Sequence, residues 1–104
     1  MDKKSFALKL IPCRPTFAQD MSAEERQVMQ EHIVFWCNLM DKGIALIFGP
    51  VLDPKAVYGL AIVSVDSEEE AMAISRNDPA SRINSYEVFP MMAITPETRK
   101  QATR

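Results

Sequence analysis

Residues 43–65, GIALIFGPVLDPKAVYGLAIVSV, contain two apolar stretches on either side of a short polar segment. The segment holds Asp53, Pro54 and Lys55, and Asp-Pro is typical of a turn, because proline presets the backbone and aspartate bonds the following N–H groups. Both stretches have the length of a strand and are rich in β-branched residues. We therefore expect a strand over residues 44–51, a strand over residues 57–65 and an antiparallel hairpin between them.

Both faces of this hairpin are apolar. Strict alternation places Leu46, Phe48, Leu60 and Ile62 on one face, and Ala45, Ile47, Ala61 and Val63 on the other. A sheet with one face in water normally alternates apolar with polar residues, and an open apolar face this large is unusual in a soluble monomer. We therefore predict a homodimer that packs sheet against sheet. Light scattering at micromolar concentration checks this, and a monomer would contradict it.

Two helices are expected around the hairpin. Ser22 and Glu25 form a capping box at the start of a helix that reaches about Lys42, where Gly43 ends it. A second capping box, Ser67 with Glu70, starts a helix that ends near Asn77. The first helix has an apolar stripe at helical spacing, which consists of Val28, Met29, His32, Phe35, Trp36, Leu39 and Met40.

Strands over residues 5–12 and 85–92 complete a βαββαβ order. This order predicts a ferredoxin-like α+β domain, in which right-handed crossovers place both helices on one face of an antiparallel sheet. We assign residues 1–95 to this domain and residues 96–104 to a polar C-terminal tail. A loop is expected over residues 13–21.

The composition is that of an ordinary globular protein, with 104 residues, 47% hydrophobic residues and a formal charge of −2. The sequence has no basic stripe for nucleic acid and no apolar run long enough to span a membrane. No signal-peptide pattern is present, so a cytoplasmic location is expected, with Cys13 and Cys37 as buried or half-buried thiols. No nucleotide, phosphate or metal motif is found, and no cofactor is expected.

His32, the only histidine, is the best candidate for chemistry, because imidazole exchanges protons near neutral pH. On its position within the apolar stripe alone, a core histidine bonded to a backbone carbonyl is the favoured interpretation. Asp78 follows the second predicted helix, and an aspartate beside an imidazole fixes its tautomer. From spacing alone, a helix-end or turn aspartate before Pro79 is the favoured interpretation. Nothing in the spacing shows that the two residues meet.

Four further residues are candidates for holding a substrate. Arg14, between two prolines, is suited to a bidentate grip on a carboxylate or phenolate, although a solvated arginine fits as well. Phe17, Trp36 and Phe48 are suited to the walls of an apolar pocket, although such aromatics are often simply core residues.

The chain resembles the YCII-related (YciI-like) family over nearly its whole length. The resemblance rests on the order and spacing of Arg14–Phe17, Met21, Glu24-Glu25, Glu31-His32, Phe35-Trp36, Leu39, Gly43, Phe48–Val51, Asp53-Pro54, Tyr58-Gly59, the acidic start of the second helix, Asp78-Pro79 and Tyr86–Met91. One departure is that Ala56-Val57 replaces a glycine often found in the hairpin turn, which affects the expected shape of the turn and not the site.

The resemblance implies a dimeric α/β barrel and a histidine–aspartate pair, which match His32 and Asp78. Relatives include enzymes that eliminate halide from chlorinated hydroxyquinols, and the wider superfamily includes muconolactone isomerases. One hypothesis is therefore an enzyme that isomerises, or eliminates a group from, a small cyclic or aromatic acid or phenol. The alternative is a non-catalytic binding or accessory protein, because one fold hosts many functions.

Overall fold

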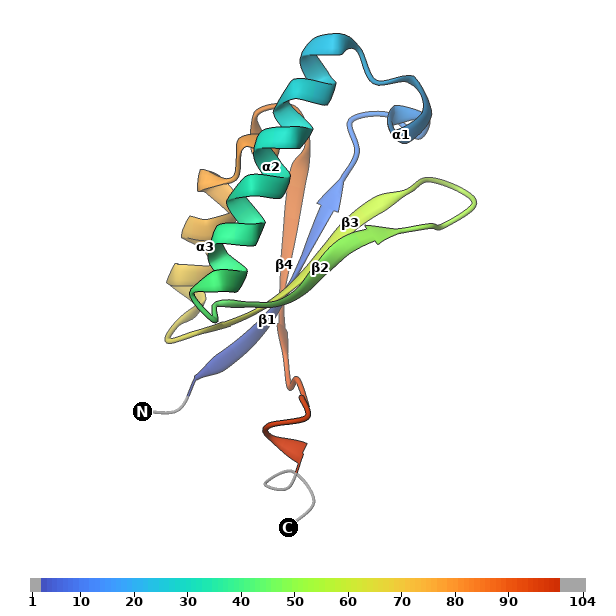
Figure 1. Cartoon of the computed structure of the whole chain (residues 1–104). Coiled ribbons are helices and arrows are strands. Elements are labelled where there is room, and N and C mark those ends of the chain that lie inside the picture. The colour runs from blue at the N-terminus through green and yellow to red at the C-terminus, as the bar shows by residue number, and fades with distance from the viewer. Residues whose placement is uncertain (1–2, 100–104) are drawn as a thin grey trace.

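The computed structural model describes residues 3–99, and these residues form a ferredoxin-like α+β domain. Its elements are β1 (Lys4–Ile11), α1 (Phe17–Asp20), α2 (Ala23–Asp41), β2 (Ala45–Val51), β3 (Tyr58–Val65), α3 (Glu68–Asn77), the 3-10 helix η1 (Pro79–Arg82) and β4 (Ser85–Met91). The four strands pair antiparallel in the order β2-β3-β1-β4. The helices α2 and α3 lie on one side of this sheet (Figure 1). The predicted fold class is confirmed.

The start of α2 shows why the helix begins where the sequence predicts. The Ser22 side chain accepts a hydrogen bond from the Glu25 N–H at 3.1 Å, and the Glu25 carboxylate accepts one from the Ser22 N–H at 2.9 Å. These two bonds satisfy N–H groups that the helix itself leaves free. After α2, Gly43 has a φ of 77°, a left-handed conformation that glycine adopts without strain.

The start of α3 departs from prediction in one detail. Ser67 caps the Glu70 N–H as expected, but the Glu70 carboxylate accepts from the N–H of Asp66 rather than from that of Ser67. The hydrogen bond from the backbone to the Glu70 carboxylate is therefore made one residue earlier in the chain than in a standard capping box. Because the dipole of the helix favours acidic groups in its first turn, Glu68, Glu69 and Glu70 all suit this position.

Two short helices, α1 and η1, form where a loop and a strand entry were expected. In α1, the backbone N–H of Asp20 bonds to the carbonyl of Thr16 at 3.1 Å. In η1, Pro79 occupies the first turn, where its missing N–H is not needed. The helix α1 connects β1 to the start of α2, and η1 connects α3 to β4.

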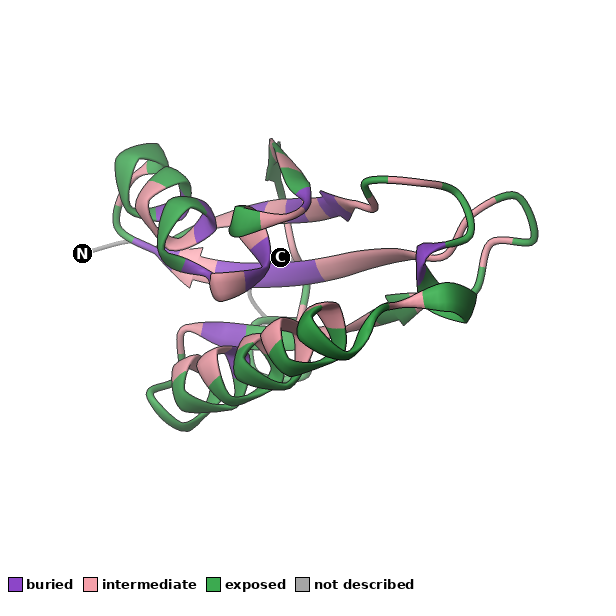
Figure 2. Ribbon diagram, turned by 90° about the horizontal axis from the view of Figure 1, so that it is seen from above, coloured by how far each residue is buried: buried purple, intermediate pink, exposed green. Residues whose placement is uncertain are grey.

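The core lies between the sheet and the two helices (Figure 2). Its fully buried side chains come mainly from one face of β1 and β3 and from Trp36 on α2. Most of the predicted apolar stripe of α2 is buried or half-buried, whereas Met40 is exposed, because it lies at the edge of the stripe near the end of the helix. Cys13 and Cys37 are free thiols and both are exposed, which corrects the expectation of burial.

A β-bulge in β2 corrects the predicted faces of the hairpin. The register pairs Ala45 with Val63, skips a residue, and then pairs Ile47 with Ile62 and Phe48 with Ala61. An extra residue in one strand reverses the direction of every side chain after it. Phe48 therefore points toward the helices, and Ile47 points to the open face, where it is 63% exposed. Strict alternation grouped Phe48 with Leu60 and Ile62 and grouped Ile47 with Ala61 and Val63, and the register shows that both assignments are wrong.

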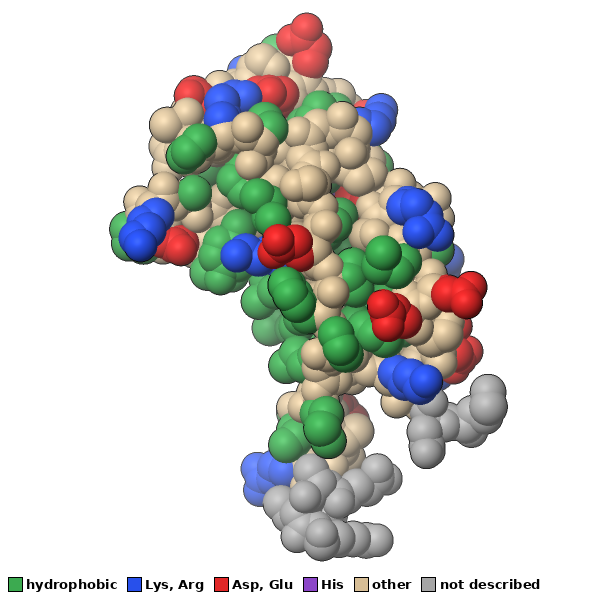
Figure 3. Space-filling view, turned by 180° about the vertical axis from the view of Figure 1, so that it is seen from behind, with side chains coloured by type: hydrophobic (Ala, Val, Ile, Leu, Met, Phe, Trp, Pro, Cys, Tyr) green, Lys and Arg blue, Asp and Glu red, His purple; other side chains and the backbone are tan. Residues whose placement is uncertain are grey.

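The sheet face away from the helices remains apolar. Phe89 and Met91 are exposed there along with Ile47, and Figure 3 shows hydrophobic side chains gathered on this side of the molecule. Within this face, Lys9 on β1 lies opposite Glu87 on β4 in the sheet register. The predicted homodimer stays a prediction, and this face is the surface that a second copy would cover.

The predicted tail over residues 96–104 lies partly outside the described residues, which end at 99. Its beginning contains a turn in which the Thr95 N–H donates to the Thr98 hydroxyl at 2.9 Å. The boundary of the domain at residue 95 is likewise a prediction.

Candidate functional site

Asp78 is the centre of the candidate site, because its buried carboxylate accepts four hydrogen bonds. One oxygen accepts from the N–H of Ala80 at 2.9 Å, which caps η1. The other oxygen accepts from Trp36 Nε1 at 2.8 Å, from the hydroxyl of Tyr86, and from His32 Nδ1 at 2.7 Å. Asp78 is only 1% exposed. These donors come from α2, η1 and β4, so the carboxylate joins three elements that are distant in sequence.

The carboxylate of Asp78 is ionised at neutral pH. Burial alone would raise its pKa, but the hydrogen bonds from its four partners outweigh burial and hold the pKa below its usual value. The pKa of Tyr86 is shifted in the opposite direction, upward. Burial and then the negative charge of Asp78 raise the pKa of its hydroxyl, so the tyrosine stays neutral.

His32 receives its orientation from Asp78. Because the carboxylate is ionised and lies 2.7 Å from Nδ1, we assign the proton of the neutral imidazole to Nδ1, which leaves the lone pair on Nε2. The side chain of His32 is 13% exposed, and the ring lines a cavity. Within the described residues, Nε2 makes no hydrogen bond. The sequence left open whether residues 32 and 78 meet, and the structure brings them together.

The cavity lies between α2, α1 and the helix-facing side of the sheet. Its volume is about 260 Å³. Most of its wall is apolar, and no Lys, Arg, Asp or Glu belongs to it. Beside His32, the polar side chains on the helix-facing side of the wall are those of Trp36 and Tyr86, and both donate to Asp78. Tyr58 also belongs to the wall, but its ring lies under Lys9 on the open face of the sheet. Small-molecule sites commonly combine an apolar wall with a few polar groups in this way.

The three predicted aromatic wall residues all line this cavity. Phe17 reaches it from α1, Trp36 from α2 and Phe48 from β2. The rings of Trp36 and Phe48 lie 6.1 Å apart between centroids. Trp36 is fully buried, so it belongs to both the core and the site, and Phe48 reaches the cavity only because of the bulge in β2.

Tyr86 is the site residue that the sequence reasoning missed. It lies on β4 opposite Leu10, on the helix-facing side of the sheet, with its hydroxyl against Asp78. Its position in the predicted last strand could have revealed it. Alternation places Tyr86 and the charged Glu87 on opposite faces, so Tyr86 faces the core, where a tyrosine hydroxyl normally has a hydrogen-bond partner.

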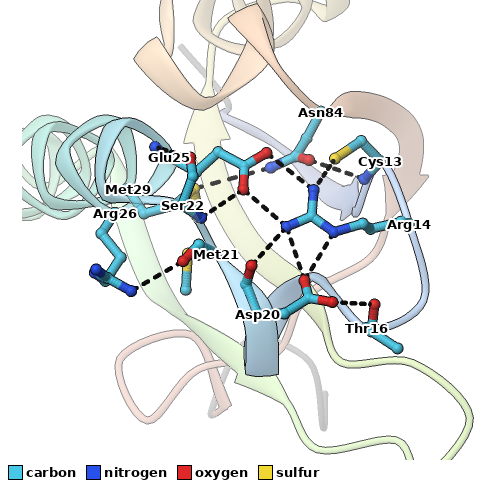
Figure 4. Close-up of polar contacts among 10 residues, drawn as sticks. All are labelled: Cys13, Arg14, Thr16, Asp20, Met21, Ser22, Glu25, Arg26, Met29 and Asn84. Carbon is cyan, nitrogen blue, oxygen red and sulfur yellow. Dashed lines mark hydrogen bonds and ion pairs between the residues drawn. The ribbon is translucent and has the colours of Figure 1, made fainter.

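Arg14 lies outside the cavity wall and is held by acidic groups (Figure 4). Its guanidinium donates to both carboxylate oxygens of Glu25, at 2.8 and 2.9 Å, and to the Asp20 carboxylate at 2.8 Å. It also lies 5.3 Å from the ring centroid of Phe17. Its role as a substrate anchor stays a prediction, since a ligand anion would have to displace a carboxylate from the guanidinium.

The contacts of Arg14 hold α1, which carries Phe17, against the start of α2. Glu25 belongs to the capping box of α2 and accepts from Arg14 at the same time. Asp20 accepts from Arg14 and from Thr16, which closes α1. The arginine therefore joins α1 to the first turn of α2, next to one end of the cavity.

Acid should weaken the ion pair between Arg14 and Glu25. The hydrogen bonds from Arg14 lower the pKa of Glu25 from an ordinary 4.5 to about 2. A lowered folded-state pKa contributes stability that is present above the ordinary value and is lost as the pH falls toward the folded-state value. We expect the denaturation midpoint to fall between about pH 4.5 and pH 2, and this fall to be smaller in Glu25→Gln.

The effect should be modest, because the pair is partly exposed to solvent and salt screens it. Urea denaturation at several pH values measures it. Glu24→Gln, a change at the exposed neighbour in the same helical turn, is the matched control and should retain the pH dependence of the wild type. An unchanged pH dependence in Glu25→Gln would contradict the assignment.

Among residues 3–99, no group of three or more His, Cys, Asp or Glu side chains could hold a metal ion. No helix in this range is long and apolar enough to cross a membrane. The site therefore consists of an oriented imidazole at the wall of a small apolar cavity.

This fold and this site define a small ferredoxin-like protein with a buried aspartate bonded to a half-buried histidine beside a cavity. The sequence matches the YCII-related domain over residues 8–95, which is most of the chain. The chain belongs to the YCII-related family, as its sequence motifs predicted. A search of curated proteins finds no match to it.

Proposed function

We propose that this protein is an enzyme that moves a proton on a small cyclic or aromatic acid or phenol, with His32 as general base and acid. The observation that carries the proposal is the geometry of His32. Its Nδ1 lies 2.7 Å from an ionised, buried carboxylate, and its ring lines a cavity. A base must be oriented and must be able to reach the substrate, and this arrangement supports both requirements.

Asp78 is the positioning residue. Its negative charge keeps the proton on Nδ1 and stabilises the imidazolium that forms when Nε2 accepts a second proton. Trp36 and Tyr86 hold the carboxylate in place from two other directions. Because both are neutral donors, the charge of Asp78 remains available to stabilise the imidazolium.

The proposed step begins with transfer of a proton from a substrate carbon to Nε2. In an isomerisation, the electron pair of the C–H bond shifts into a neighbouring double bond, and the imidazolium returns the proton to another carbon. In an elimination, the same pair forms a new double bond, and a halide leaves with its bonding electrons. Both steps balance without an added oxidant or reductant. One positioned acid–base group typically contributes about 10²–10⁴-fold to the rate.

The test compares the wild type with His32→Ala on a panel of muconolactones and chlorinated phenols. We expect turnover of at least one compound by the wild type and a loss of about 10²–10⁴-fold in kcat in the variant. Equal turnover by both proteins would exclude His32 as the catalyst. Absence of turnover by the wild type across the panel would favour the alternative of a binding protein.

A further inference from the structure

The charges around the cavity narrow the class of substrate. An anionic ligand that leaves water needs an excess of positive charge or several donors at its site, because an unpaired charge in an apolar cavity is costly. The wall contains no Lys or Arg. The charge that the cavity offers therefore depends on the two polar clusters beside it.

The first cluster, His32 with Asp78, carries no net positive charge while Asp78 is ionised. Asp78 is ionised, so the pair has a charge of −1 when the imidazole is neutral and 0 when it is protonated. Tyr86 adds no charge, because burial and Asp78 both keep its hydroxyl protonated.

The second cluster, Arg14 with Asp20 and Glu25, has one cation and two carboxylates and therefore a net charge of −1. All the contacts of the guanidinium with the two carboxylates are at 2.8 or 2.9 Å, and each of its three nitrogens takes part in at least one of them. Two further cations lie nearby. Lys9 is on the opposite face of the sheet, over the ring of Tyr58, and the exposed Arg26 donates at 2.9 Å to the carbonyl of the lining residue Met21 from outside the wall.

We infer that the cavity selects an uncharged molecule of about one substituted ring, with a hydroxyl or similar group for His32, and rejects carboxylates of the same size. This inference rests on the proposed function and narrows its substrate class to neutral compounds. The size follows from the volume of about 260 Å³. An apolar cavity of about 150 Å³ already accepts benzene. A hydroxyl on the ring pairs with Nε2 of His32, and the remainder of the ring contacts the apolar wall.

The experiment measures binding rather than turnover, so that it can fail independently of the proposed function. Trp36 is the only tryptophan and lines the cavity, and its fluorescence reports occupancy. The probes are p-cresol, p-toluate and 4-methylbenzylamine, which have one methyl-substituted ring and differ in charge at pH 7. A phenol with an ordinary pKa near 10 is neutral there.

We expect p-cresol to bind at least about tenfold more tightly than p-toluate, because the carboxylate loses its hydration and meets no cation in the wall. We also expect it to bind more tightly than the amine, because the apolar wall contains no carboxylate that could replace the hydration of an ammonium group. Equal or tighter binding of p-toluate or of the amine overturns the inference. So does a failure of all three probes to change Trp36 fluorescence, because a cavity of this size and wall would then not accept a single ring.

A matched pair of variants tests whether charge is the cause. Ile33 lines the cavity and is 52% exposed, whereas Val34 is 60% exposed and does not line it. Both positions tolerate a lysine because both are open to water. Ile33→Lys should reduce or reverse the preference for p-cresol over p-toluate, and Val34→Lys should leave it unchanged. The same ratio in all three proteins overturns the inference.

Discussion

Asp78→Asn should lower the free energy of unfolding by about 2–4 kcal/mol. Both carboxylate oxygens of Asp78 accept hydrogen bonds, one from Ala80 N–H and the other from three side chains. An amide has only one oxygen, so in either orientation its NH₂ group faces a donor. The substitution therefore leaves at least one buried donor without an acceptor, and it also removes the negative charge that the site is built around.

A loss of this size is large for a domain whose total stability is about 5–15 kcal/mol. It corresponds to a fall in Tm of roughly 10–30 °C. Urea denaturation followed by circular dichroism measures it. Asp66→Asn is the control, because Asp66 is exposed and pairs with Lys3 on the surface. It should change stability by less than about 0.5 kcal/mol. Asp78→Asn with the stability of the control would show that the four bonds contribute little.

The elements of the fold could be predicted because their signals are local. The capping box of α2 lies within Ser22–Glu25, and the turn of the hairpin lies at Asp53-Pro54, where the Asp53 side chain accepts from the Lys55 N–H at 2.9 Å. The bulge in β2 could not be predicted. Its neighbours are all apolar, so no change of polarity marks the residue at which the alternation reverses.

The site depends on contacts that no local pattern records. Forty-six residues separate His32 from Asp78, and their meeting depends on how η1 turns the chain back toward α2. Sequence motifs of the family pointed to the pair, whereas spacing alone did not. The contacts of Arg14 could not be predicted in the same way, because its partners Asp20 and Glu25 come into reach only through α1 and the start of α2. Its role as an anion anchor stays a prediction.

Trp36→Ala should lower the free energy of unfolding by about 3–5 kcal/mol, the usual cost of removing a buried aromatic side chain. Trp36 is fully buried between Phe35 and Phe48, and it also donates to Asp78. Trp36→Phe keeps most of the apolar contact but removes the donor, so it should cost less, about 1–3 kcal/mol. Equal losses in the two variants, measured by urea denaturation, would assign the whole effect to the donor.

The coupling free energy between Trp36 in the core and Asp78 in the site can be measured by combining Trp36→Phe with Asp78→Asn. If Trp36 stabilises the protein partly by bonding to the ionised carboxylate, its substitution costs less once that carboxylate has become an amide. The double-mutant cycle should then show a coupling free energy of about 0.5–3 kcal/mol. Asparagine is preferred to alanine at position 78, because it keeps the side-chain volume and the folded state of all four proteins. Strict additivity would mean that the tryptophan stabilises the core through packing alone, and that Asp78 is held in place by His32, Tyr86 and Ala80.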